Sequence, residues 1–235
     1  MALTDKLTAI GDAIREKTGS TDALTLDQMV SEIEGITVGG GGDGGFNETS
    51  FVEGMGIGCE TYTNDRISVI IDRAFYGEPV LKHLIVPNLT EVASYGFYGA
   101  NVLETVSSPN LVTIGSNGFD QCKALTSVDV SKVTTINTNC FYGCPQLKKL
   151  DFASLNSNVK TYAFYNCTNL NTLIFRSPTV LTLDSSYAIR GSGIYYSTGY
   201  IYVPDDLVED YKVATNWANF ANQIKPLSEY VEVTE

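Results

Sequence analysis

The sequence predicts a β-rich solenoid built from about five repeats of roughly 22 residues each. Two observations support this fold class: a phenylalanine recurs at a nearly constant spacing, and the apolar residues around it keep constant offsets. The spacings are 22, 22, 22 and 23 residues, and the phenylalanines are Phe75, Phe97, Phe119, Phe141 and Phe164. Because one unit cannot bury its apolar side alone, we expect the units to stack around one continuous core.

Each repeat carries a short leucine-rich segment after its phenylalanine. A leucine stands six residues after every phenylalanine, and a leucine or valine follows three positions later. The position before the phenylalanine is small in every repeat. The alternation of apolar and polar residues in the leucine-rich segment predicts a short strand whose alternate side chains point inward.

Three units show the pattern most clearly. Residues 96–100 read Gly-Phe-Tyr-Gly-Ala, residues 140–144 read Cys-Phe-Tyr-Gly-Cys, and residues 163–167 read Ala-Phe-Tyr-Asn-Cys. With the Leu-x2-Leu/Val stretch that follows each, these units resemble BspA-type bacterial leucine-rich repeats over about residues 65–180. The resemblance implies a leucine-rich-repeat fold. No phenylalanine follows Phe164 at the same spacing, so we expect the solenoid to be ending there.

The segments outside the repeats are predicted to be helical at both ends. Leu3, Leu7, Ile10 and Ile14 form one apolar stripe of an amphipathic helix, which suits self-association or docking to another protein. The simpler alternative is a helical hairpin packed on its own chain. Near the other end, Asp205 is expected to cap a helix that begins a terminal cap. The predicted organisation is a helical anchoring and oligomerisation module (1–38), a glycine-rich linker (39–45), strands that lead into and cap the first repeat (46–68), the solenoid (69–200), and a helical C-terminal cap and tail (201–235).

The first residues also resemble a known kind of leader. Leu3–Leu7 reads Leu-Thr-Asp-Lys-Leu, Ala13–Gly19 reads Ala-Ile-Arg-Glu-Lys-Thr-Gly, and Leu26–Met29 is followed by Ile33–Ile36. This pattern resembles the short leader of tail and other virion proteins from phages or prophages of Gram-positive, often gut, bacteria. The resemblance implies attachment to other virion proteins through residues 1–38, with self-association that we expect to be trimeric.

Charge and targeting signals exclude several classes of partner. The net charge is −12 and no basic patch is present, so nucleic acid and anionic membrane surfaces are not expected as partners. The N-terminus has acidic residues where a signal peptide would be basic, and it lacks an apolar core. We therefore expect the protein to be made in a host cytoplasm and carried on a virion.

Candidate catalytic and metal-binding residues are few. His83 is the only histidine, and it falls at an outward strand position, which favours a surface residue over a catalytic one. Cys122, Cys144 and Cys167 share one repeat position and have no histidine beside them, so a buried apolar ladder is expected instead of a zinc site. The odd number of cysteines argues against a disulfide scaffold. The sequence therefore predicts no enzyme, no metal and no cofactor.

Candidate binding residues lie at the alternate, outward positions of the predicted strands. Solenoids bind ligands on their concave face, so these small, mixed and nearly neutral side chains suit a glycan or a protein surface. They are His83, Ile85, Thr105, Ser107, Ser127, Asp129, Lys149, Asp151, Thr172 and Ile174. A second row, in which Asp120 interrupts the tyrosines, favours packing between repeats, with stacking on sugars or on a partner as the alternative; it comprises Tyr76, Tyr98, Tyr142 and Tyr165.

The leading functional hypothesis from the sequence is a non-enzymatic phage virion protein of the tail-fibre or receptor-binding class. Its N-terminal helices would anchor it, and its repeats would contact a glycan or protein on the host surface. The alternatives are a structural decoration or head fibre without a receptor, and a BspA-like bacterial surface adhesin.

Overall fold

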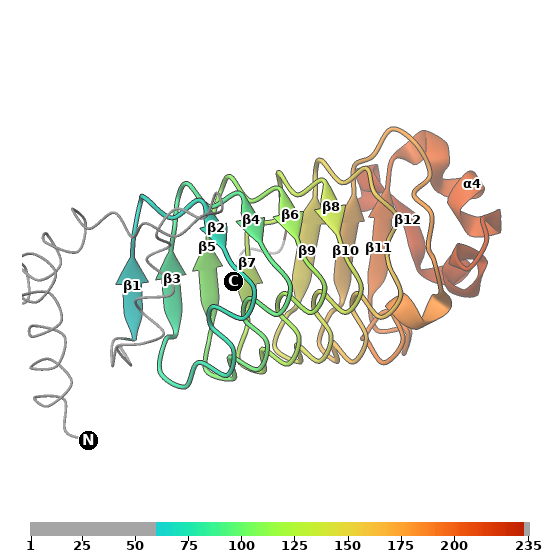
Figure 1. Ribbon diagram of the computed structural model, residues 1–235. Coiled ribbons are helices and arrows are strands. Elements are labelled where there is room, and N and C mark those ends of the chain that lie inside the picture. The colour runs from blue at the N-terminus through green and yellow to red at the C-terminus, as the bar shows by residue number, and fades with distance from the viewer. Residues whose placement is uncertain (1–59, 233–235) are drawn as a thin grey trace, which may run out of the picture. The chain divides into compact units, whose positions relative to one another are not determined.

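A computed structural model describes residues 60–232, which wind into a solenoid of stacked coils (Figure 1). One row of parallel strands runs along it in two ladders, which consist of β1 (Thr61–Thr63), β3 (His83–Ile85), β5 (Thr105–Ser107) and β7 (Ser127–Val128), and of β9 (Lys149–Phe152), β10 (Thr172–Phe175), β11 (Tyr200–Val203) and β12 (Ile224–Pro226). We call this row the strand face. A separate, third ladder of two-residue strands contains β2 (Val69–Ile70), β4 (Glu91–Val92), β6 (Thr113–Ile114) and β8 (Thr135–Ile136).

The strand register confirms the repeat read from the sequence. Each strand pairs in parallel with the equivalent strand of the next repeat, as in the pairing of Leu84 with Val106. These inward residues are almost fully buried, while the residues on either side of them point away from the core. The fold is therefore a leucine-rich-repeat type solenoid with parallel strands. The predicted N-terminal helical module lies outside the described residues.

The repeating phenylalanine forms a continuous stack through the core. Neighbouring rings have centroids 5.0, 5.1, 5.3 and 6.1 Å apart, with interplanar angles of 3–16°. All five rings are at most 2% exposed. Near-parallel stacking adds to the free energy that burial of these rings already contributes.

Two positions in every turn adopt the left-handed backbone conformation. They lie two residues before and two residues after the phenylalanine, as shown by Asn117 and Gln121 around Phe119, with φ values of 58° and 60°. Asparagine and glycine tolerate this region best, and they fill six of these ten positions. The turn is therefore sharp enough to return the chain to the next coil at a fixed repeat length.

The cysteine ladder is buried, as predicted, and it has a further bonding role. The thiols of Cys122, Cys144 and Cys167 each donate to the backbone carbonyl of the phenylalanine one repeat earlier, at 3.0, 3.0 and 2.9 Å. Burial raises the pKa of Cys122 and Cys144 well above that of a free thiol. The thiols of Cys122 and Cys144 therefore stay protonated, and the three hydrogen bonds link neighbouring coils. Cys59 lies outside the described residues.

The solenoid contains one more unit than the five predicted from the phenylalanine spacing. The backbone N–H of Phe164 donates to the carbonyl of Ala188 at 2.8 Å, just as that of Phe141 donates to Ala163 at 2.9 Å. Ala188 thus occupies the small-residue position of a sixth unit, and Ile189 replaces the phenylalanine with a fully buried side chain. This unit has a longer spacing and no phenylalanine, so it lacks the periodic signal of the other five units.

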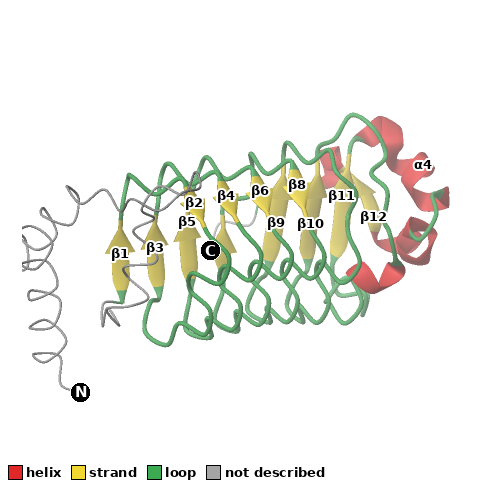
Figure 2. Ribbon diagram, in the orientation of Figure 1, coloured by secondary structure: helices red, strands yellow, loops and turns green. Residues whose placement is uncertain are grey.

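The C-terminal cap is not wholly helical, which corrects the prediction for residues 201–235. It contains the strands β11 and β12, which extend the strand face, besides α4 (Val208–Val213) and 3-10 helices. Figure 2 shows that the helical segments gather at the C-terminal end of the solenoid. The 3-10 segments are η1 (Ser186–Ala188), η2 (Asp205–Leu207), η3 (Trp217–Gln223) and η4 (Leu227–Glu229).

Asp205 does not cap the helix, contrary to the prediction. Pro204 precedes η2, and the Asp205 carboxylate accepts a hydrogen bond from the backbone of Ser228 at 3.0 Å. The cap is fixed to the last coil by Trp217, whose indole N–H donates to the carbonyl of Leu181 at 2.6 Å. The Tyr211 hydroxyl accepts from the Leu181 backbone N–H at 3.0 Å, so two buried side chains bind one residue of the coil. Within residues 60–232, no helix is long and apolar enough to cross a membrane.

Candidate functional groove

A groove lies on the strand face where its two ladders fail to join. Pairing runs from β1 to β7 and resumes from β9 to β12, and in the described part of the chain no ladder links β7 to β9. The groove has a volume of about 580 Å³, and both strands contribute to its lining. Its inward aliphatic residues Val128, Val130 and Leu150 are buried, and apart from the exposed Ala153 the accessible lining is polar; it comprises Thr126, Ser127, Asp129, Ser131, Lys148, Lys149, Asp151 and Arg176.

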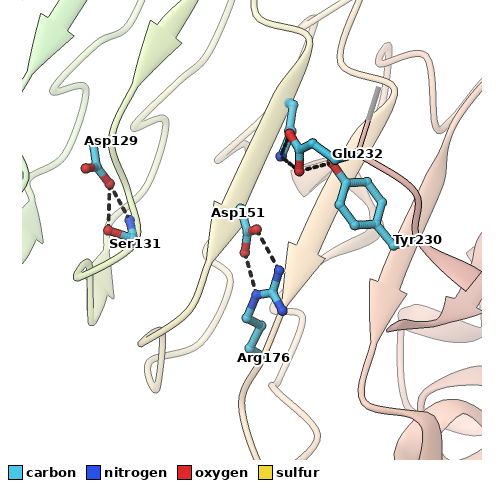
Figure 3. Close-up of polar contacts among 7 residues, drawn as sticks. Asp129, Ser131, Asp151, Arg176, Tyr230 and Glu232 are labelled. Atoms are coloured by element: carbon cyan, nitrogen blue, oxygen red, sulfur yellow. Dashed lines mark hydrogen bonds and ion pairs between the residues drawn. The ribbon is translucent and has the colours of Figure 1, made fainter. Parts of the chain in front are cut away.

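The short length of β7 has a local cause. The Asp129 carboxylate accepts hydrogen bonds from the Ser131 backbone N–H at 2.9 Å and from its hydroxyl at 2.7 Å (Figure 3). Such a turn offers the backbone an alternative to ladder bonding. The strand therefore ends at Val128, whereas β9 continues to Phe152.

An ion pair bounds the groove on the β9 side. The guanidinium of Arg176 donates to both carboxylate oxygens of Asp151 at 2.9 Å, in the forked geometry typical of strong arginine–carboxylate pairs (Figure 3). Both side chains remain about one third exposed. The pair thus presents a planar, charged but internally balanced surface.

The C-terminal tail lies on the strand face beside the groove. The Lys149 ammonium donates to both carboxylate oxygens of Glu232, at 2.6 and 2.8 Å. The Tyr230 hydroxyl donates to Glu232 at 2.9 Å (Figure 3), and the Tyr230 ring packs against Tyr202 at 5.0 Å. The hydrogen bond from Lys149 lowers the pKa of Glu232.

The tail explains why one predicted binding residue is unavailable. Ile174 of β10 is fully buried, which contradicts its prediction as an exposed binding residue. Tyr230 contacts Lys149 on β9 and Tyr202 on β11, the strands on either side of β10, so it crosses over this position. The tail therefore covers an outward position that the repeat pattern alone assigns to the surface.

The other predicted positions are exposed or half-exposed. Ser127, Asp129, Lys149 and Asp151 come together in the groove. The others lie along the strands on either side of it, and they are His83, Ile85, Thr105, Ser107 and Thr172. The oligomerisation residues Leu3, Leu7, Ile10 and Ile14 lie outside the described residues, and their role stays a prediction.

Sequence reasoning missed Ser131, Arg176 and Glu232, which help to shape the groove and its edge. The Asp-x-Ser spacing of Asp129 and Ser131 is a turn signal that could have been used. Arg176 stands immediately after the last apolar residue of its strand. Glu232 gave no signal, because it contacts Lys149 across 83 residues and outside the repeat.

The groove has binding chemistry without the features of a catalytic centre. His83 lies two repeats away, with its Nδ1 atom 3.0 Å from the Thr105 hydroxyl, and it takes no part in the groove. Among residues 60–232, no cluster of metal-ligating side chains is present. The arrangement suits recognition of a ligand through hydrogen bonds.

The fold and the polar groove define a leucine-rich-repeat protein of the binding class. A family profile described as "BspA type Leucine rich repeat region" matches residues 63–192 in six copies. The chain therefore belongs to the BspA-type leucine-rich-repeat family, in which no enzymatic activity is indicated. The six copies exceed by one the five repeats expected from the phenylalanine spacing.

Two solved structures are similar to this chain. A leucine-rich cell surface protein from Faecalibacterium prausnitzii A2-165 is 22% identical with a TM-score of 0.50, over 72% of this chain and 48% of that one. A leucine-rich-repeat protein from Bacteroides ovatus ATCC 8483 is 16% identical with a TM-score of 0.28, over 71% of this chain and 60% of that one. This chain thus spans about half of the first protein and three fifths of the second. No curated protein matches the sequence.

Proposed function

We propose that this chain is a non-enzymatic recognition protein of the surface-adhesin type, and that the groove between β7 and β9 binds a glycan. Membership of the BspA-type family supports the adhesin reading more directly than the virion reading. The single observation behind the choice of site is a polar groove at the interruption of an otherwise continuous strand face.

The lining of the groove favours a glycan over a protein ligand. Protein interfaces depend on aromatic and apolar anchors that fill desolvated pockets. The accessible lining here consists mainly of hydroxyl, carboxylate and ammonium groups, while the aliphatic residues beneath them are buried. Such groups match the alternating donors and acceptors of a sugar chain. The Tyr230 ring beside the groove adds a surface on which a sugar ring can stack.

A binding measurement with a matched pair of variants tests this proposal. Purified protein is applied to immobilised bacterial and host surface polysaccharides, and the best ligand is titrated against wild type, Asp129→Asn and Asp72→Asn. Asp129→Asn removes the groove charge while keeping an oxygen for the local turn, and Asp72 is an exposed carboxylate in the first full repeat. A hydrogen bond to a charged group contributes about 1.5–3 kcal/mol, so the groove variant should bind at least about tenfold more weakly.

Two results would contradict the proposal, the first by rejecting the groove as the site and the second by rejecting a glycan as the ligand. One is equal affinity of both variants for the best polysaccharide, which would place binding elsewhere. The other is the absence of saturable binding to any polysaccharide together with saturable binding to a surface protein, which would reject the glycan.

A virion location is a second proposal, and it is supported by the resemblance of the N-terminal segment to phage leaders. Its test is deletion of residues 1–38 in a phage that encodes the chain. We expect the truncated protein to be lost from purified particles. Normal incorporation and assembly of the truncated protein would refute the anchoring role.

A further inference from the structure

The turns of the solenoid carry a row of tyrosines with a gap one repeat wide. Tyr76 stacks on Tyr98 with centroids 4.9 Å apart and an interplanar angle of 17°, and Tyr142 stacks on Tyr165 at 5.1 Å and 15°. Asp120 occupies the equivalent position in the repeat between these pairs. The faces of Tyr98 and Tyr142 that are not stacked therefore point towards the gap from opposite sides.

One oxygen of the carboxylate in this gap lacks the partner that a buried charge needs. Asp120 is 6% exposed, and its Oδ1 atom is buried without a hydrogen-bond donor. Burial raises the pKa of Asp120 to about 6, and the nearby Gln121 side chain lowers it only in part. Because an unsatisfied buried acceptor destabilises the folded state, such groups call for an explanation.

A second unsatisfied acceptor lies in the next repeat. Asn117 and Asn139 occupy the turn position that holds Tyr95 and Tyr162 in the flanking repeats. The Asn139 amide donates to Asn117 at 3.0 Å, but its own Oδ1 atom is buried without a partner. The interruption of the aromatic rows thus leaves two oxygen acceptors without donors in two neighbouring repeats.

Tyrosine rings at the turn position two residues before the phenylalanine, or before Ile189 in the sixth unit, already hold cations. The Arg73 guanidinium lies 5.1 Å from the centroid of Tyr95, and that of Arg190 lies 4.9 Å from the centroid of Tyr187. Across the gap, Tyr98 and Tyr142 are two repeats apart, or about 10 Å at the usual spacing of neighbouring strands. A cation midway between them would lie about 5 Å from both rings, within the roughly 6 Å range of cation–π attraction.

We propose that the gap formed by Tyr98, Asp120 and Tyr142 binds a primary alkylammonium group, of the kind that a lysine side chain of a partner protein carries. The carboxylate supplies the opposite charge, the two rings supply cation–π attraction, and the ammonium supplies the missing donors. Rotation of the surface tyrosine rings opens access to the carboxylate on a fast timescale. A quaternary ammonium has no N–H group, so it satisfies neither acceptor.

An NMR titration of the full-length protein with n-butylammonium tests the site. Protein with ¹³C-labelled tyrosine rings and ¹⁵N-labelled backbone is titrated as wild type, Asp120→Asn and Asp129→Asn. We expect saturable shifts centred on residues 98, 120 and 142, unchanged in Asp129→Asn and weakened about tenfold or more in Asp120→Asn. Tetramethylammonium should bind more weakly than n-butylammonium to the wild type.

Three outcomes of the n-butylammonium titration would overturn the proposal. They are no saturable shift, shifts that centre on other residues, and equal affinity of wild type and Asp120→Asn. Stronger binding of tetramethylammonium would also refute it, since the unsatisfied acceptors would then play no part. The glycan groove is tested independently, because Asp129→Asn changes only that site.

Discussion

Replacing Asp120 by asparagine should stabilise the protein at neutral pH and leave it unchanged in acid. The pKa of this carboxyl is raised by burial from 3.8 to about 6, so the folded state holds the proton more tightly than the unfolded chain does. The stability gained from the protonated form is present below about pH 4 and is lost as the pH rises through 6. Above this range the buried charge costs about 3 kcal/mol at 1.36 kcal/mol per pKa unit. Asparagine has the same shape without the charge.

The assay is urea unfolding followed by far-UV circular dichroism at pH 4 and pH 7.5. We expect Asp120→Asn to raise the free energy of unfolding by about 2–3 kcal/mol at pH 7.5 and by less than about 0.5 kcal/mol at pH 4. The exposed control Asp72→Asn should stay within about 0.5 kcal/mol of wild type at both pH values. An effect of Asp120→Asn that is the same at both pH values, or a loss of stability at pH 7.5, would refute the reasoning.

Five further substitutions test the packing by the same urea assay. Phe119→Ala removes a fully buried ring from the middle of the stack and should lower the free energy of unfolding by about 3–5 kcal/mol. Tyr76→Ala, at the exposed end of the tyrosine row, should lower it by about 1 kcal/mol. Equal losses for the two variants would contradict the stacked core. Gly115→Ala should cost about 3 kcal/mol or more, because its Cβ would lie 2.7 Å from backbone of the preceding repeat. Gly77→Ala, where φ is +67° but the space is open, should cost about 1 kcal/mol, and the reverse order would be inconsistent with the packing. Trp217→Phe should cost about 1–3 kcal/mol, because a buried carbonyl loses its indole donor, and an unchanged midpoint would count against this bond.

The repeat core was predictable because its spacing follows directly from the physics of stacking. The phenylalanine stack and the buried cysteine ladder both follow from side chains that recur at one position of every coil. The same argument placed Asp129, Lys149 and Asp151 on the strand face, where the structure brings them into one groove.

Features that depend on contacts outside the repeat could not be predicted in this way. Ile189 replaces the phenylalanine of the sixth unit after a longer spacing, so no periodic signal marks it. The cap strands β11 and β12 pair with a sheet edge that only the folded solenoid provides. Ile174 is covered by a tail whose position depends on Lys149, which is remote from it in sequence.

The bonds that join each coil only to its neighbours have a mechanical consequence. Ring stacks, thiol bonds and strand ladders link residues that are about one repeat apart, while the Trp217 cap closes the C-terminal end. Under tension applied to the ends of the chain, the coils should detach singly. Each released coil of 22 residues would add roughly 73–79 Å of extended chain. A protein of this design lengthens in regular steps under load, so that part of the solenoid can yield while the rest stays folded.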